Sequence, residues 1–139
     1  MSPAPNFGQP PDLADLDRIA AEAFLSIPLT LRRHVEGVAI RVEEFPDDET
    51  LEDMDLESPF DLLGLYRGAD LAHRGANDVR RDIDMIFLYR RPLLDYWCDT
   101  GEDLTHLVRH VLIHEIGHHF GFSDDDMDAI EAGAGSGPA

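Results

Sequence analysis

The spacing of apolar residues predicts two long helices, one near each end of the chain. The first is predicted to begin after Asp12, whose side chain can cap a helix, and to end before Pro28. The second is predicted from about Asp103 to Phe120, and a short helix from about Asp124 to Ala132 is expected to follow it. In the first helix, the apolar residues at helical spacing are Leu13, Leu16, Ile19, Ala20, Ala23 and Phe24.

Three segments between these helices have the composition of strands. Val38–Glu43 shows β-branched alternation and stops near Pro46. Leu62–Arg67 is closed by Gly68, and Asp84–Arg90 is apolar enough to be a more buried strand. A few strands packed on two long helices indicate an α+β fold.

These elements predict one domain over residues 12–132. A chain of 139 residues can bury about two thirds of its unfolded surface without needing a metal to fold. Residues 1–11 and the Gly/Ala-rich residues 133–139 are expected to be disordered, because they cannot bury enough apolar area to offset their ordering entropy. The sequence shows no signal peptide and no run of about 20 apolar residues, so a cytoplasmic protein without a membrane span is expected.

The charge and the cysteine content of the chain limit the classes of partner and of covalent cross-link that it can have. The chain has 29 acidic residues against 11 basic ones, for a net charge of −18, which argues against nucleic acid and anionic membranes as partners. The acidic stretch 43–61 is interpreted as a solvated loop, rather than as a calcium loop or an attractor for basic substrates. Cys98 is the only cysteine, so no intramolecular disulfide forms, and we expect it to be buried or half-buried. The sequence shows no stripe of residues along an element that would require an oligomer, so a monomer is expected.

The sequence from His114 to His118, His-Glu-Ile-Gly-His, has the spacing of a metal site. Histidines at i and i+4 on a helix differ by about 40° of rotation and about 6 Å of rise, so both imidazoles can converge on one ion. Glu115 points to a different azimuth and is left free as a base. A zinc ion with three protein ligands keeps its fourth position for water, lowers the pKa of that water to about 7, and lets a nearby carboxylate take the proton.

A third metal ligand is expected from the residues after this motif. Gly121 falls three residues past His118, where a left-handed glycine can end the helix and turn the chain back towards the metal. Phe122 can then pack into the core, and Ser123 can cap the next helix. Asp124 needs the shortest turn to reach the metal. The acidic alternatives that the sequence leaves open are Asp125, Asp126 and Asp128.

Two further histidines flank the motif. His110 lies four residues before His114, so a second metal or a proton shuttle is conceivable there. One zinc ion cannot be reached from three successive turns, and we therefore interpret His110 as a helix-surface residue or a group that supports the ligands. His119 is rotated by about 100° from His118 and is expected to hydrogen-bond to the body of the protein.

The residues from His114 to Asp124 resemble the extended zincin signature His-Glu-x-x-His-x-x-Gly-x-x-Asp. The chain as a whole resembles the minimal zincin-like metallopeptidases, a family of small bacterial single-domain proteins, over about residues 12–132. Three segments carry this resemblance, namely Leu63–Gly68, Ile86–Pro92 and Arg109–Gly121. The resemblance implies a minimal zincin-like fold in which a small mixed sheet packs on two long helices. It also implies a site with Zn²⁺ held by His114, His118 and Asp124, and with Glu115 as the catalytic residue.

The function implied by the resemblance is hydrolysis of peptide bonds by a zinc-bound water that Glu115 activates, with a peptide or protein as substrate. In zincins an edge strand supplies main-chain hydrogen bonds to the substrate, and Leu62–Tyr66 is expected to be that strand. Because Leu62, Leu63 and Leu65 are apolar, an interior strand is the alternative. Two other functions stay open: a metal-dependent hydrolase of a small non-peptide amide, and a catalytically silent zinc-binding protein with a regulatory or binding role.

Overall fold

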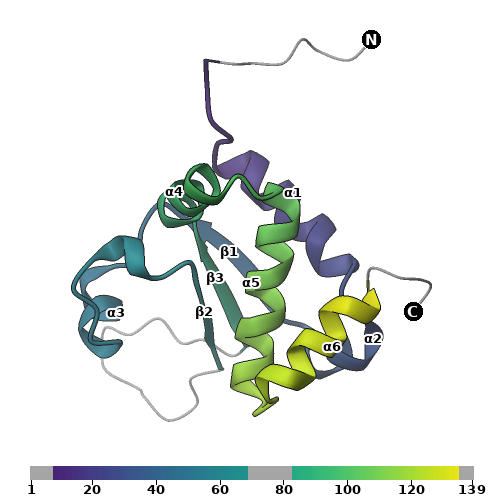
Figure 1. The fold of residues 1–139 in the computed structure, drawn as a ribbon. Helices are drawn as coiled ribbons and strands as arrows, with labels where there is room; N and C mark the ends of the chain where they lie inside the picture. The colour runs from purple at the N-terminus through teal and green to yellow at the C-terminus, as the bar shows by residue number, and fades with distance from the viewer. Residues whose placement is uncertain (1–7, 69–82, 135–139) are drawn as a thin grey trace.

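The computed structural model describes residues 8–68 and 83–134, and it has the predicted α+β fold (Figure 1). Most of the two tails predicted to be disordered lies outside the described residues. In chain order, the elements are α1 (Leu13–Leu25), α2 (Leu29–Arg32), the 3₁₀ turn η1 (Arg33–Val35), β1 (Ala39–Glu43), α3 (Asp48–Asp53), the 3₁₀ turn η2 (Pro59–Asp61), β2 (Gly64–Arg67), β3 (Met85–Tyr89), α4 (Arg90–Thr100), α5 (Leu104–His119) and α6 (Asp124–Ala134).

The three strands form one mixed sheet in the order β1-β3-β2. β1 runs parallel to β3, with Ile40 opposite Ile86, whereas β2 runs antiparallel to β3, with Tyr66 opposite Ile86. All three predicted strands are therefore present. In the part of the chain that the structure describes, β2 pairs with β3 alone, so this strand lies at the edge of the sheet, as expected, and the interior alternative is wrong.

One face of the sheet packs against α1 and α5. α1 lies against β1, α5 lies against β2, and the two helices contact each other (Figure 1). Leu16 of α1 and the β3 residues Ile86 and Leu88 are fully buried in this core. Gly64 lets α5 approach β2 closely, because a Cβ at that position would lie 2.8 Å from Cγ1 of Val111. The edge strand is thus held directly against the helix that carries the motif.

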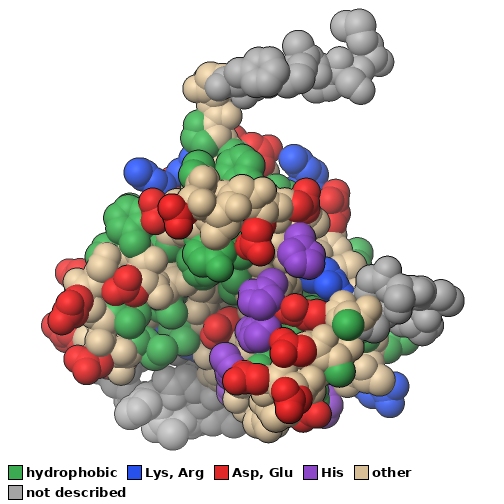
Figure 2. All heavy atoms as spheres, viewed as in Figure 1, with side chains coloured by type: hydrophobic (Ala, Val, Ile, Leu, Met, Phe, Trp, Pro, Cys, Tyr) green, Lys and Arg blue, Asp and Glu red, His purple; other side chains and the backbone are tan. Residues whose placement is uncertain are grey.

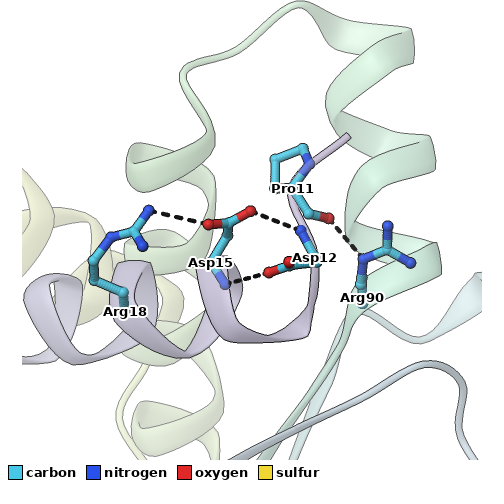
Figure 3. A network of polar contacts seen from close by, with 5 residues as sticks. All are labelled: Pro11, Asp12, Asp15, Arg18 and Arg90. Carbon is cyan, nitrogen blue, oxygen red and sulfur yellow. Dashed lines mark hydrogen bonds and ion pairs between the residues drawn. The ribbon is translucent and has the colours of Figure 1, made fainter. Parts of the chain in front are cut away.

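The start of α1 is fixed by reciprocal hydrogen bonds (Figure 3). The Asp12 carboxylate accepts from the N–H of Asp15 at 2.8 Å, and the Asp15 carboxylate accepts from the N–H of Asp12 at 2.9 Å. This capping box satisfies two N–H groups that have no partner within the helix, and it confirms Asp12 as the cap. Arg18 lies 3.3 Å from the Asp15 carboxylate, and Arg90 donates from Nε to the carbonyl of Pro11 at 2.7 Å. The second contact ties the entry of α1 to the start of α4.

Three features differ from the sequence-based expectations. α4 was not predicted, and it begins directly where β3 ends. The acidic stretch interpreted as a solvated loop contains α3 and η2. Cys98 lies on α4 and is exposed, whereas a buried or half-buried position was expected. No helix within residues 8–68 and 83–134 is both long and apolar enough to cross a membrane.

Candidate metal centre and general base

Helix α5 has an apolar side in the core and a side that carries a row of histidines. Asp103 caps its first turn by accepting from the N–H of His106 at 2.9 Å. His110, His114 and His118 follow one another at intervals of one helical turn and therefore lie on one side of α5. Figure 2 shows histidine side chains in a row over α5, beside acidic side chains over α6. The buried residues of α5 are Leu104, Leu107, Val108, Val111, Leu112, Ile113, Ile116 and Gly117.

His114 and His118 turn their rings towards each other. Their ring centroids are 5.9 Å apart, at an interplanar angle of 77°. The side chain of His114 is 20% exposed and that of His118 is 58% exposed. Burial lowers the pKa of His114 from its ordinary value of 6.5, and the nearby His110 lowers it further. A histidine with a lowered pKa is neutral at neutral pH, which is the form that binds a metal.

Glu115 has the environment of a proton acceptor and donor. Burial raises the pKa of its carboxyl, while the charge of His118 and a hydrogen bond from the backbone N–H of Tyr66 act in the opposite direction. A raised carboxyl pKa brings the group closer to the pH at which it must take and return a proton. Because Tyr66 belongs to β2, this influence on the pKa indicates that the carboxyl of Glu115 lies near the edge strand.

The chain reverses direction after α5 through a left-handed glycine, as predicted. Gly121 has φ +79°, the N–H of Phe122 donates to the carbonyl of Gly117 at 2.8 Å, and the N–H of Gly121 donates to the carbonyl of His118 at 3.3 Å. This pair of hydrogen bonds is a Schellman motif, which satisfies the last carbonyls of a helix. Phe122 packs against the core, as expected.

Helix α6 then begins beside the histidines. The Ser123 hydroxyl accepts from the N–H of Asp126 at 3.0 Å, and the Asp126 carboxylate accepts from the N–H of Ser123 at 3.2 Å, so the predicted Ser123 cap is present. Oδ1 of Asp124 lies 3.9 Å from Nε2 of His118. One potential ligand atom from each of His114, His118 and Asp124 lies within 4.8 Å of the others. Among the described residues, Asp125, Asp126 and Asp128 take part in no such cluster.

A second cluster shares His114 with the first one. Oε1 of Glu131 on α6 lies 2.7 Å from Nδ1 of His110 and 3.3 Å from Nε2 of His114. Sequence reasoning missed Glu131 altogether. A signal was present, since Glu131 follows Asp124 by seven residues, or about two helical turns, and both side chains therefore lie on one side of α6.

The last turn of α5 is fixed to the edge strand through aromatic contacts. The ring of His119 stacks on that of Tyr66, with centroids 4.0 Å apart. The Tyr66 hydroxyl donates to the Asp84 carboxylate at 2.5 Å. The structure therefore shows His119 stacked on a strand residue, and the expected hydrogen bond to the body of the protein stays a prediction.

The chain was also compared with known proteins. The family model described as zincin-like metallopeptidase matches residues 35–134, which include the whole sheet, α4, α5 and α6. The chain therefore belongs to the family of zincin-like metallopeptidases. No curated protein matches it at a significant level.

The family implies zinc, and the residues present fit that ion. Two imidazoles and a carboxylate form a ligand set that zinc takes in hydrolytic enzymes. The Nε2 atom of His114 is buried and has no hydrogen-bond partner in the described part of the chain, although a buried polar atom normally has one. A metal ion would supply the missing partner.

Proposed function

We propose that the protein is a zinc-dependent peptidase in which His114, His118 and Asp124 hold the metal and Glu115 transfers the proton. The observation that carries this proposal is the convergence of His114, His118 and Asp124, of which one potential ligand atom each lies within 4.8 Å of the others, next to the half-buried Glu115 on the same helix. The position defined by His114, His118 and Asp124 is called the catalytic metal position below.

The proton chemistry follows from the environment of Glu115. His114, His118 and Asp124 would hold zinc at the catalytic metal position, which would supply Lewis-acid polarisation of the scissile carbonyl and would lower the pKa of water to about 7. Glu115 takes a proton from the attacking water and passes it to the leaving amine. Its raised pKa assists the first transfer, because a carboxylate with a higher proton affinity is a stronger base towards the attacking water.

The edge of β2, which pairs with no strand among the described residues, supports a peptide as the substrate. A free strand edge offers N–H and C=O groups to an extended chain, which binds through its own main chain as an added strand. An extended peptide on β2 would lie close to Glu115, because the backbone of Tyr66 is near enough to that carboxyl to lower its pKa. The exposure of His118 also favours an open cleft over the closed pocket expected for a small amide.

The experiment that tests this function compares two neighbouring aspartates. Asp124→Ala should lower peptide cleavage by at least about a hundredfold, because losing a metal ligand should cost no less than losing a group that supports one. Asp125→Ala is the matched control, since Asp125 is an exposed aspartate in the same turn and belongs to no metal cluster in the described chain. Cleavage of a peptide library is measured by mass spectrometry with zinc-loaded and chelator-treated protein.

We expect wild type and Asp125→Ala to cleave peptides and to stop when the metal is chelated. We expect Asp124→Ala to show no cleavage. Equal cleavage by wild type and Asp124→Ala would place the third ligand elsewhere. An absence of cleavage by zinc-loaded wild type across the library would favour a catalytically silent binding protein.

A further inference from the structure

The second cluster, made of His110, His114 and Glu131, is more compact than the catalytic one. Its carboxylate oxygen lies 2.7 Å and 3.3 Å from the two imidazole nitrogens, whereas the closest histidine and carboxylate of the catalytic position are 3.9 Å apart. The Glu131 side chain is 18% exposed, against 85% for Asp124. The burial of the Glu131 carboxylate, more than the short distances, suggests that it binds a ligand.

Two buried polar atoms face each other in this cluster without a hydrogen bond. Nε2 of His114 and Oε1 of Glu131 lie 3.3 Å apart, and among the described residues neither makes a hydrogen bond of acceptable geometry, although Oε1 of Glu131 also lies 2.7 Å from Nδ1 of His110. Buried polar atoms normally have a partner, and a bound ion is one of the usual reasons for an exception. A cation between the two atoms would satisfy both.

The distances also suit a tetrahedral zinc-like ion. Nitrogen and oxygen ligands about 2.0–2.2 Å from such an ion lie about 3.3–3.6 Å from each other. The 3.3 Å between His114 and Glu131 falls in this range. His110, at 2.7 Å from the same oxygen, would have to move outward by a few tenths of an ångström, which its partly exposed side chain permits.

We propose that His110, His114 and Glu131 form a second metal position for Zn²⁺ or a chemically similar ion such as Co²⁺. Two histidines one helical turn apart and a glutamate form a ligand set that zinc accepts. A neutral imidazole has one nitrogen with a free lone pair, so His114 can serve only one of the two positions at a time. The two positions therefore compete, and the chain holds one ion. An ion at the second position removes His114 from the catalytic one.

The test removes the catalytic position and measures metal binding alone, so it does not depend on hydrolysis. In His118→Ala/Asp124→Ala the two deleted side chains are mostly exposed, and the fold should be retained. Titration with Co²⁺, followed by visible absorption and by competition with Zn²⁺, should show one bound ion per chain. Addition of Glu131→Gln should weaken that binding by at least about a hundredfold, because an amide is a much poorer zinc ligand than a carboxylate.

Two more variants complete the design. Asp125→Asn in place of Glu131→Gln is the matched control on α6 and should leave the binding unchanged. His110→Ala, at a partly exposed side chain, should weaken the binding as Glu131→Gln does, and it serves if the latter fails to fold. The proposal is overturned if folded His118→Ala/Asp124→Ala binds no ion, or if neither Glu131→Gln nor His110→Ala weakens the binding. Failure of wild type to cleave peptides would contradict the proposed function and leave this result unaffected.

Discussion

Gly117 stands between the two histidines of the motif at a point where no side chain would fit. A Cβ there would lie 2.2 Å from Sδ and 2.7 Å from Cγ of Met127, a fully buried residue of α6. The missing side chain lets α6 approach α5 closely. Since Asp124 and Glu131 are both on α6, this contact sets the position of both carboxylates relative to the histidines.

Gly117→Ala should therefore destabilise the protein even though alanine is the better helix former. Overpacking costs about 1–3 kcal/mol, and the gain in helix propensity is about 1 kcal/mol, so the net loss of unfolding free energy should be up to about 2 kcal/mol. In a Met127→Ala background the clash is gone, and the same substitution should be neutral or stabilising. Urea denaturation of the four proteins measures this cycle, and an equal loss in both backgrounds would rule out the clash as the cause.

The core of the site could be read from the sequence because its residues are local. His114, Glu115 and His118 occupy one turn of a single helix, and their relative directions follow from helix geometry. The position of Asp124 could also be predicted, since one glycine turn separates it from that helix. The position of Glu131 could not be predicted, because its distance to His110 depends on how closely α6 packs on α5. That packing depends on the absence of a side chain at Gly117.

At the scale of elements, the turn after α5 joins the histidines to Asp124. Gly121 has φ +79°, and Gly101, which ends α4, has φ +72°. A Cβ at either glycine would meet no atom within 4 Å, so the two positions differ in location but not in crowding. Substitutions at these two glycines can therefore be compared to separate the cost of backbone strain from an effect on the metal site.

Alanine at either glycine should cost about 1–2 kcal/mol of unfolding free energy, because the left-handed conformation is unfavourable for residues with a Cβ. Only Gly121→Ala should also lower peptide cleavage, by about ten- to a hundredfold, since relaxing that turn displaces Asp124. Thermal melts and cleavage rates of the two variants provide the comparison. A similar loss of cleavage in Gly101→Ala would mean that lowered stability, rather than the turn, causes the effect.

The helices and strands that have periodic apolar residues and caps or turn residues were predicted, and the elements that lack these features were not. The three strands and α1, α5 and α6 combine periodic apolar residues with caps or turn residues. α4 follows β3 without a linking loop, and it has Pro92 in its first turn, where a missing N–H costs no helical hydrogen bond. The parallel pairing of β1 with β3 is not encoded in either strand, because it depends on where the intervening chain crosses.

At the scale of the whole molecule, the net charge of −18 should influence which peptides reach the cleft. An acidic protein attracts cationic substrates over a distance that salt shortens from about 30 Å at 0.01 M to about 8 Å at 0.15 M. For a cationic peptide, kcat/KM should fall by about tenfold over this range, whereas a neutral peptide with the same scissile bond should change little. Equal salt dependence for the two peptides would exclude electrostatic attraction.

The most direct measurement of the central claim is the zinc content and the peptidase activity of Glu115→Gln, determined on the same sample. Glutamine keeps the size of the side chain but cannot take the proton, so zinc should stay at one ion per chain while cleavage falls by about 10²- to 10⁴-fold. Wild type treated identically provides the reference. Cleavage by Glu115→Gln at the wild-type rate, or loss of its zinc, would contradict the assignment of Glu115 as the group that transfers the proton.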